Sequence, residues 1–239
     1  MTAPNALLLL ALWAPLLALA GGEHATSNHS PIATYEAEYS ARYSGFPIKA
    51  AHSLRQTGNG YALRITARNF LGKITEEELF HLDTQGAIVP DRYEHDRSIM
   101  GNKRTESMAV NHTDLTIMSL RKGEQSALDF EPGQLGPLSH QLALARDLRE
   151  GVEELSYAVI IRGSVRDYRY QRLGEEDMDT ALGTLRVVKL ERMRDNSDRE
   201  TLLWLAPEFN YQPVLLRQIE DGSSYELTLQ SFRFTRENN

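Results

Sequence analysis

The chain has 239 residues, a formal net charge of −7 and no cysteine. The lack of cysteine excludes disulfides, thiol nucleophiles, thiolate metal sites and lipid attachment at a lipobox cysteine. The acidic balance, with basic residues spread along the chain, argues against a nucleic-acid partner.

The chain opens with an apolar segment typical of a secretory signal. Residues 6–19 are almost all apolar, and Ala18-Leu19-Ala20 has the small-x-small pattern of a cleavage site. The run is shorter than the about 20 apolar residues that span a bilayer, and Pro15 would interrupt a spanning helix. We therefore expect residues 1–20 to be removed on export to the periplasm, leaving no membrane span; an uncleaved anchor is the alternative. Residues 21–31 are expected to be a disordered leader, followed by a single β-rich domain over residues 32–236.

From Tyr35 onward the sequence alternates with the period of β-strands. Tyr35, Ala37 and Tyr39 fall on one face, and Glu36 and Glu38 fall on the other. Turn signals such as Thr-Gly-Asn-Gly at 57–60 separate the segments. Further strands are predicted over residues 48–54, 61–67, 73–82, 91–97, 104–110, 113–117, 155–161, 167–173, 185–193, 200–206, 214–219 and 225–234.

One helix interrupts the strands. Between residues 138 and 148 leucine and alanine recur at helical spacing. Pro137 precedes this segment, Ser139 is the candidate N-cap, and Gly151 is expected to end the helix. The predicted fold is all-β: a curved antiparallel sheet, forming a half-barrel or open barrel, with one covering helix.

The sequence carries no recognisable catalytic or metal-binding motif. Glu76-Glu77-Glu78 contains candidates for an acid/base pair, but we expect these charges on the solvent face of a strand. Glu94-His95-Asp96 has metal-ligand residue types, but neighbours on a strand point to opposite faces. The other histidines show no ligand spacing, and neither a nucleophile elbow nor a phosphate loop occurs. We therefore predict no catalytic residues, no metal site and no cofactor.

Aromatic and aliphatic side chains on strand faces have two interpretations. They fill a packed core, or they line a ligand cavity on the concave face of an incompletely closed sheet. Trp204 lies in a strand of leucines and is expected to be buried on the inner face. The candidates to line a cavity are Tyr35, Tyr39, Leu63, Ile65 and Trp204.

Three C-terminal segments carry a resemblance to a known family. They are residues 180–192, 201–208 and 213–220, with further matches at residues 138–144 and at Tyr35-x-Ala37-x-Tyr39. This pattern resembles the exported bacterial family catalogued as domain of unknown function 3108. His140 stands where an aromatic residue such as tyrosine is expected. The resemblance implies export and a β-rich fold, and the family has no agreed activity.

A second resemblance concerns the strand that contains Trp204, the turn over residues 207–213 and the strand over 214–220. It is similar to the LolA and LolB type of half-barrel carriers, curved antiparallel sheets closed by helices that shelter lipoprotein acyl chains. It implies non-catalytic binding of an apolar or amphipathic, lipid-like ligand in the periplasm. The alternatives are an envelope-assembly module that binds an envelope protein and, third, an envelope hydrolase.

Overall fold

A computed structural model describes residues 32–43, 46–194, 199–220 and 223–235. The predicted signal peptide, residues 1–20, and the predicted leader, residues 21–31, lie outside the described residues.

The described residues form strands, one α-helix and a short 3-10 helix. The helices are α1 (His140–Glu150) and η2 (Pro207–Phe209). The strands are β1 (Tyr35–Tyr43), β2 (Phe46–Thr57), β3 (Gly60–Asn69), β4 (Gly72–Leu82), β5 (Ile88–Ile99), β6 (Asn102–Asn111), β7 (Thr116–Arg121), β8 (Glu124–Asp129), β9 (Leu155–Ile161), β10 (Ser164–Thr180), β11 (Gly183–Met193), β12 (Glu200–Ala206), β13 (Gln212–Glu220) and β14 (Ser223–Phe234).

All of these strands belong to one antiparallel sheet. Its order is β8-β7-β6-β5-β4-β3-β2-β1-β14-β13-β12-β11-β10-β9, so every two adjacent strands are consecutive in the chain except β1 and β14. That pairing joins the first and last strands in the middle of the sheet. The edge strands β8 and β9 do not pair with each other, so the sheet is open, as the sequence predicted.

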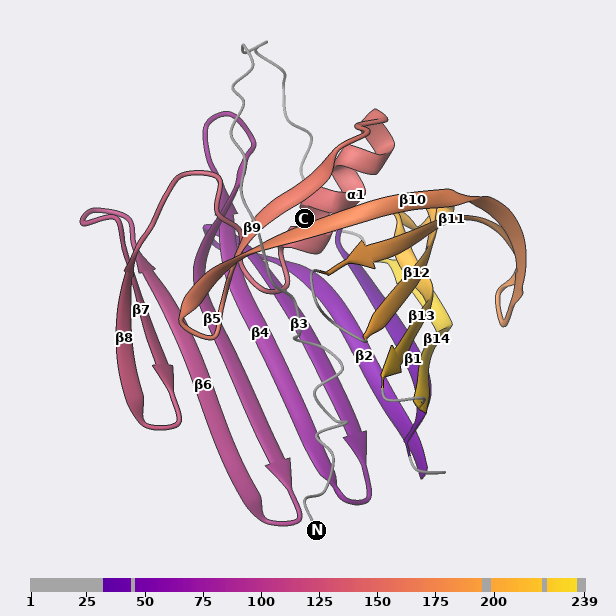
Figure 1. The fold of residues 1–239 in the computed structure, drawn as a ribbon, viewed down its shortest axis with the longest axis horizontal. Helices are drawn as coiled ribbons and strands as arrows, with labels where there is room; N and C mark the ends of the chain where they lie inside the picture. Colours follow the sequence, from indigo (N-terminus) through magenta and orange to yellow (C-terminus); the bar gives the residue numbers. More distant parts are fainter. Residues whose placement is uncertain (1–31, 44–45, 195–198, 221–222, 236–239) are drawn as a thin grey trace.

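The sheet curls until its two halves face each other. Figure 1 shows β1 to β8 as a broad wall, with β10 passing across it and α1 lying at one end between the two halves. The turn between β9 and β10 approaches the wall, since a Cβ added at Gly163 would lie 2.7 Å from the Ser126 hydroxyl of β8. A buried apolar core fills the space between the halves. The concave side therefore meets core and helix.

The structure differs from the predicted elements at the β7–β8 edge. Leu115 was expected inside a strand, but its positive φ of 49° places it in a turn, and β7 begins at Thr116. The edge strand β8 was not predicted. Five of its six residues are exposed, so it has none of the alternation that reveals a half-buried strand.

A carboxylate from the sheet stabilises the start of α1. Glu78 Oε2 accepts hydrogen bonds from the backbone N–H groups of Leu138 (2.6 Å) and Ser139 (3.0 Å). Ser139 is the N-cap residue, as predicted, but its side chain makes no capping bond, and its hydroxyl accepts from the Gly136 N–H instead. Free N–H groups and the helix dipole make this end favourable for an acidic side chain. Gly151, with φ 75°, ends the helix as predicted.

Candidate ligand-binding site

The concave side of the sheet retains a small internal cavity next to α1. Its volume is about 90 Å³, and it lies among side chains of α1, β1 to β3, β10 and β12 to β14. Tyr39, Ile65, Leu144 and Leu203 give it apolar walls. The volume is well below the about 300–1,000 Å³ of typical ligand pockets. The cavity is therefore too small to hold a whole lipid.

A hydrogen-bonded polar group lies at one side of this cavity. The Tyr35 hydroxyl is 3.2 Å from His52 Nε2, and its other side-chain partner is Gln212. Burial lowers the pKa of His52 to about 4, so its ring is neutral at neutral pH and Nε2 can accept a hydrogen bond from the Tyr35 hydroxyl. Among the described atoms, the Tyr39 hydroxyl and Gln212 Oε1 are buried without a hydrogen-bond partner. Such atoms are available to a polar group or a water molecule that enters.

A larger cleft lies on the other side of α1. Its volume is about 490 Å³, and it is bounded by the helix, the β4–β5 hairpin and the residues that lead into β1. This volume falls within the typical range for small-molecule sites. The apolar residues that line it are Ile32, Ala33, Tyr35, Leu82, Ile88, Leu142 and Ala145.

Charged side chains of α1 border the same cleft. Arg146, Arg149 and Glu150 contribute two positive charges and one negative charge. Arg146 lies 3.3 Å from the Asp147 carboxylate, and Arg149 donates to the Asn210 side chain at 2.5 Å. The cleft thus combines an apolar lining with two guanidinium groups from consecutive turns of one helix.

Gln212, the first residue of β13, lines both the cleft and the internal cavity. Its side chain is 4% exposed and keeps one unpartnered oxygen. Gln212 and its partner Tyr35, which lines the cleft, therefore form a polar layer at the boundary between the two spaces.

The structure brings only part of the predicted site together. Tyr39 and Ile65 line the internal cavity, and Tyr35 lines the cleft. Leu63 is fully buried in the core and lines neither space.

Trp204 is buried as predicted, but the predicted inner face was wrong. Leu203 and Leu205, its neighbours on β12, line the internal cavity, and alternation directs Trp204 to the opposite face. There its ring lies beneath Lys189 and Arg217, and Nε1 donates to Glu176 at 2.5 Å. Glu176 belongs to the long strand β10.

The acidic run on β4 was predicted on the solvent face, and this was wrong for two of its three residues. Glu76 and Glu78 are 1% and 0% exposed, whereas Glu77 is half-buried and pairs with Arg64. Glu76 accepts from the Tyr93 hydroxyl at 2.7 Å. Burial raises the pKa of Glu78 to about 7, against the lowering effect of its bonds to Ser139 and Leu138. Neither carboxylate lines the cavity or the cleft, so neither can reach a ligand bound there.

The motif Glu94-His95-Asp96 is divided between two faces, as alternation predicts. His95 is buried and lies 3.6 Å from Glu76, whereas Glu94 pairs with Arg92 and Asp96 accepts from Thr105.

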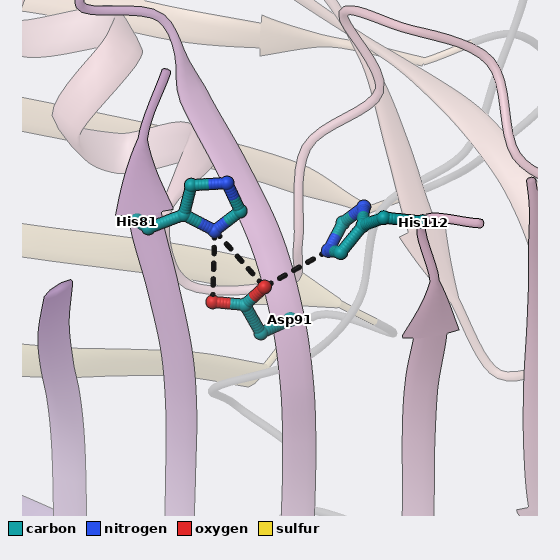
Figure 2. Close-up of side chains that lie close together, drawn as sticks. All are labelled: His81, Asp91 and His112. Carbon is teal, nitrogen blue, oxygen red and sulfur yellow. Dashed lines mark hydrogen bonds and ion pairs between the residues drawn. The ribbon is translucent and has the colours of Figure 1, made fainter. Parts of the chain in front are cut away.

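A different group of metal-ligand types does assemble, and sequence reasoning missed it. Figure 2 shows the carboxylate of Asp91 between the imidazole rings of His81 and His112. One ligand atom from each residue lies within 4.8 Å of the other two. The residues are 10 and 21 positions apart, and they meet through pairing of β4, β5 and β6. The sequence did contain one indication of this contact. The Gln85-Gly86 turn predicts that the strand before it pairs with the strand that contains Asp91.

Comparison with known proteins places the chain in a family. The family described as "Protein of unknown function (DUF3108)" matches residues 35–230, and the chain belongs to it. A search of the curated proteins found no match. Among solved structures, the chain is similar to a beta-barrel-like protein of the domain of unknown function DUF1849 from Brucella abortus. The TM-score is 0.59 at 11% identity, over 86% of this chain and 99% of that one. This likeness supports the fold alone. In the described part of the chain, no helix is long and apolar enough to cross a membrane.

Proposed function

We propose that this member of the DUF3108 family binds an amphipathic, lipid-like ligand in the periplasm and catalyses no reaction. The observation that carries the proposal is the cleft of about 490 Å³ beside α1, which has an apolar lining and arginines at its border. The polarity of the cleft favours a ligand with an apolar chain and an anionic head.

The lining of the cleft suggests how such a ligand lies. Leu82, Ile88 and Leu142 offer apolar surface to an acyl chain, whose burial contributes about 0.8 kcal/mol per methylene. Arg146 and Arg149 can donate charge-assisted hydrogen bonds to a carboxylate or phosphate. A ligand with the same chain and an uncharged head would gain the burial of its methylenes but not the charge-assisted hydrogen bonds.

The internal cavity extends this proposal. Its about 90 Å³ can take the end of a chain that passes the polar layer at Gln212. The neutral His52 and the unpartnered Tyr39 hydroxyl allow that layer to rearrange without burying a charge.

The periplasmic part of the proposal rests on the sequence of residues 1–20. Protein recovered from a periplasmic extract should have an N-terminus at or near Gly21. Recovery of only the full-length chain from the cytoplasm would contradict export.

The binding test begins with native mass spectrometry of the protein purified from its own cell envelope, followed by thermal unfolding with added fatty acids, fatty alcohols and lipopeptides. A ligand that binds the native state raises the melting temperature as its concentration rises. Replacing Arg146 and Arg149 by glutamine should weaken fatty-acid binding about tenfold or more, as expected when charge-assisted hydrogen bonds are lost. The same change should leave fatty-alcohol binding nearly unaltered.

Arg166→Gln is the matched control, since Arg166 is an exposed arginine of β10 outside the cleft lining. It should bind like the wild type. Ligand-free protein with no thermal shift for any of these compounds would overturn the proposal and leave the envelope-assembly or protein-interaction module as the better hypothesis.

A further inference from the structure

We infer that His81, Asp91 and His112 form a binding site for a divalent transition-metal ion, with Zn²⁺ as the best match to their donor atoms. The site lies at the end of the sheet where β4 meets β5 and β6 turns into β7. It is independent of the proposed lipid binding, because none of the three residues lines the cleft.

The geometry brings two nitrogens and one carboxylate together. His81 Nδ1 lies 3.0 Å from each oxygen of Asp91, and His112 Nε2 lies 2.9 Å from Asp91 Oδ1. Zn²⁺ bonds of about 2.0–2.1 Å in tetrahedral geometry would place these atoms about 3.3 Å apart. To reach tetrahedral geometry, the histidine nitrogens would move a few tenths of an ångström from the Asp91 oxygens. The two imidazole rings would also move slightly closer to each other.

A β-bulge places Asp91 in this group. Leu79 pairs with Arg92 and Phe80 pairs with Pro90, so Asp91 is the extra residue of β5. Bulges change the direction of a side chain, and they are frequent beside functional sites. A regular ladder would instead place Asp91 opposite a β4 residue.

The two turns next to the site are fixed by local hydrogen bonds. Asp83 Oδ1 accepts from the N–H groups of Gln85 and Ala87 in the β4–β5 turn. Asn111 Oδ1 accepts from the N–H groups that follow His112 in the β6–β7 turn. The backbone next to the ligands is therefore held before any ion arrives, which reduces the ordering cost of binding.

The surroundings admit an ion and still support the ligands. The side chains of His81, Asp91 and His112 are 35%, 38% and 37% exposed, so an ion can enter from solvent and keep a water as its fourth ligand. Phe130 packs against the His112 ring at 5.6 Å and restrains it. Two imidazoles and one carboxylate favour Zn²⁺ and similar ions over Ca²⁺ or Mg²⁺, which prefer oxygen-only sites.

The test uses the mature chain prepared without a histidine tag, freed of metal with a chelator and titrated calorimetrically with Zn²⁺. We expect one ion per chain at this site and a rise in melting temperature. Asp91→Asn and His112→Ala should each weaken binding about tenfold or more. Asp96→Asn, which removes an exposed carboxylate from the same strand, should leave binding unchanged.

A measurement on the wild type guards against variants that fail to fold. In the nitrogen-15 NMR spectrum of the histidine side chains, Zn²⁺ should shift two imidazoles strongly, and mutation should assign these to His81 and His112. No zinc uptake by the wild type, strong shifts in other histidines only, or equal affinity in Asp91→Asn would each overturn the inference.

Discussion

Replacing Glu78 by glutamine should change how the stability of the protein depends on pH. The glutamine carbonyl can still accept the hydrogen bonds from Leu138 and Ser139 at the start of α1. The substitution removes the ionisable group. It therefore separates the structural role of Glu78 from the cost of burying its charge.

The magnitude follows from the pKa of Glu78, which burial raises from 4.5 to about 7. Because the folded-state pKa is the higher one, the protonated group favours the native state, and this contribution is complete below pH 4.5. It is lost as pH rises through about 7, where the native state must ionise a buried carboxyl. A shift of this size corresponds to at most about 3–4 kcal/mol, at about 1.4 kcal/mol per unit.

The assay is urea unfolding of both proteins between about pH 5 and about pH 8. Buried His52 and His140, whose pKa values burial lowers to about 4 and about 3, reduce stability as pH falls below their unfolded value of 6.5. Both proteins retain them, so their effect cancels in the difference. The variant should gain on the wild type as pH rises. A difference that stays constant across this range would refute the assignment of a raised pKa to Glu78.

Substitutions at Gly136 and Trp204 test the packing around α1 and β12. Gly136→Ala would place a Cβ 1.9 Å from Glu78 Oε1 and should destabilise the fold by about 1–3 kcal/mol, while Gly58→Ala, with nothing within 4 Å, should be nearly neutral in the same denaturation assay. Trp204→Ala should lower the free energy of unfolding by about 3–5 kcal/mol. Trp204→Phe should lower it less, because phenylalanine keeps an aromatic ring in the core and loses mainly the hydrogen bond to Glu176. A loss of less than about 1 kcal/mol in urea unfolding of the alanine variant would mean that the ring is not packed as described.

The sequence predicted most strands because most strands have two different faces. The segment from Tyr61 to Ala67 alternates in sequence, and Ile65 and Ala67 are buried while Arg64 and Thr66 are half-buried. The edge strand β8 has no such contrast and was missed. Period-2 patterns report unequal burial of two faces, so a strand exposed on both faces gives no signal.

The buried carboxylates show a second limit. Glu76 and Glu78 share a strand face with Ile74 and Phe80, so the period-2 pattern placed their side chains in the core. Their charge instead suggested a solvent-exposed position. What permits burial comes from distant segments: the Tyr93 hydroxyl, 17 residues from Glu76, and the backbone at Leu138, 60 residues from Glu78. Partners at such separations follow from the tertiary structure, and local patterns do not contain them.

The group of His81, Asp91 and His112 was missed for a related reason. A regular ladder predicts which residues are opposite each other, but a bulge changes the register by one residue, and β5 has one at Asp91. His112 joins from the turn after β6, so its position depends on the conformation of that turn. Motif spacing detects ligands that share one strand or helix, and these three come from three segments.

The β4–β5 hairpin contributes residues to the start of α1, to the cleft and to the histidine–aspartate group, and it does so from different positions along its length. Glu78 points inward to the start of α1, the tip at Leu82 and Ile88 lines the cleft, and His81 and Asp91 meet His112 at the end of the sheet. Each feature has its own measurement: the pH dependence of stability, the affinity for an anionic lipid, and the binding of one zinc ion. A single substitution that altered all three would indicate loss of the hairpin itself. Substitutions that alter one measurement each would show that the hairpin is a rigid support with three separable roles.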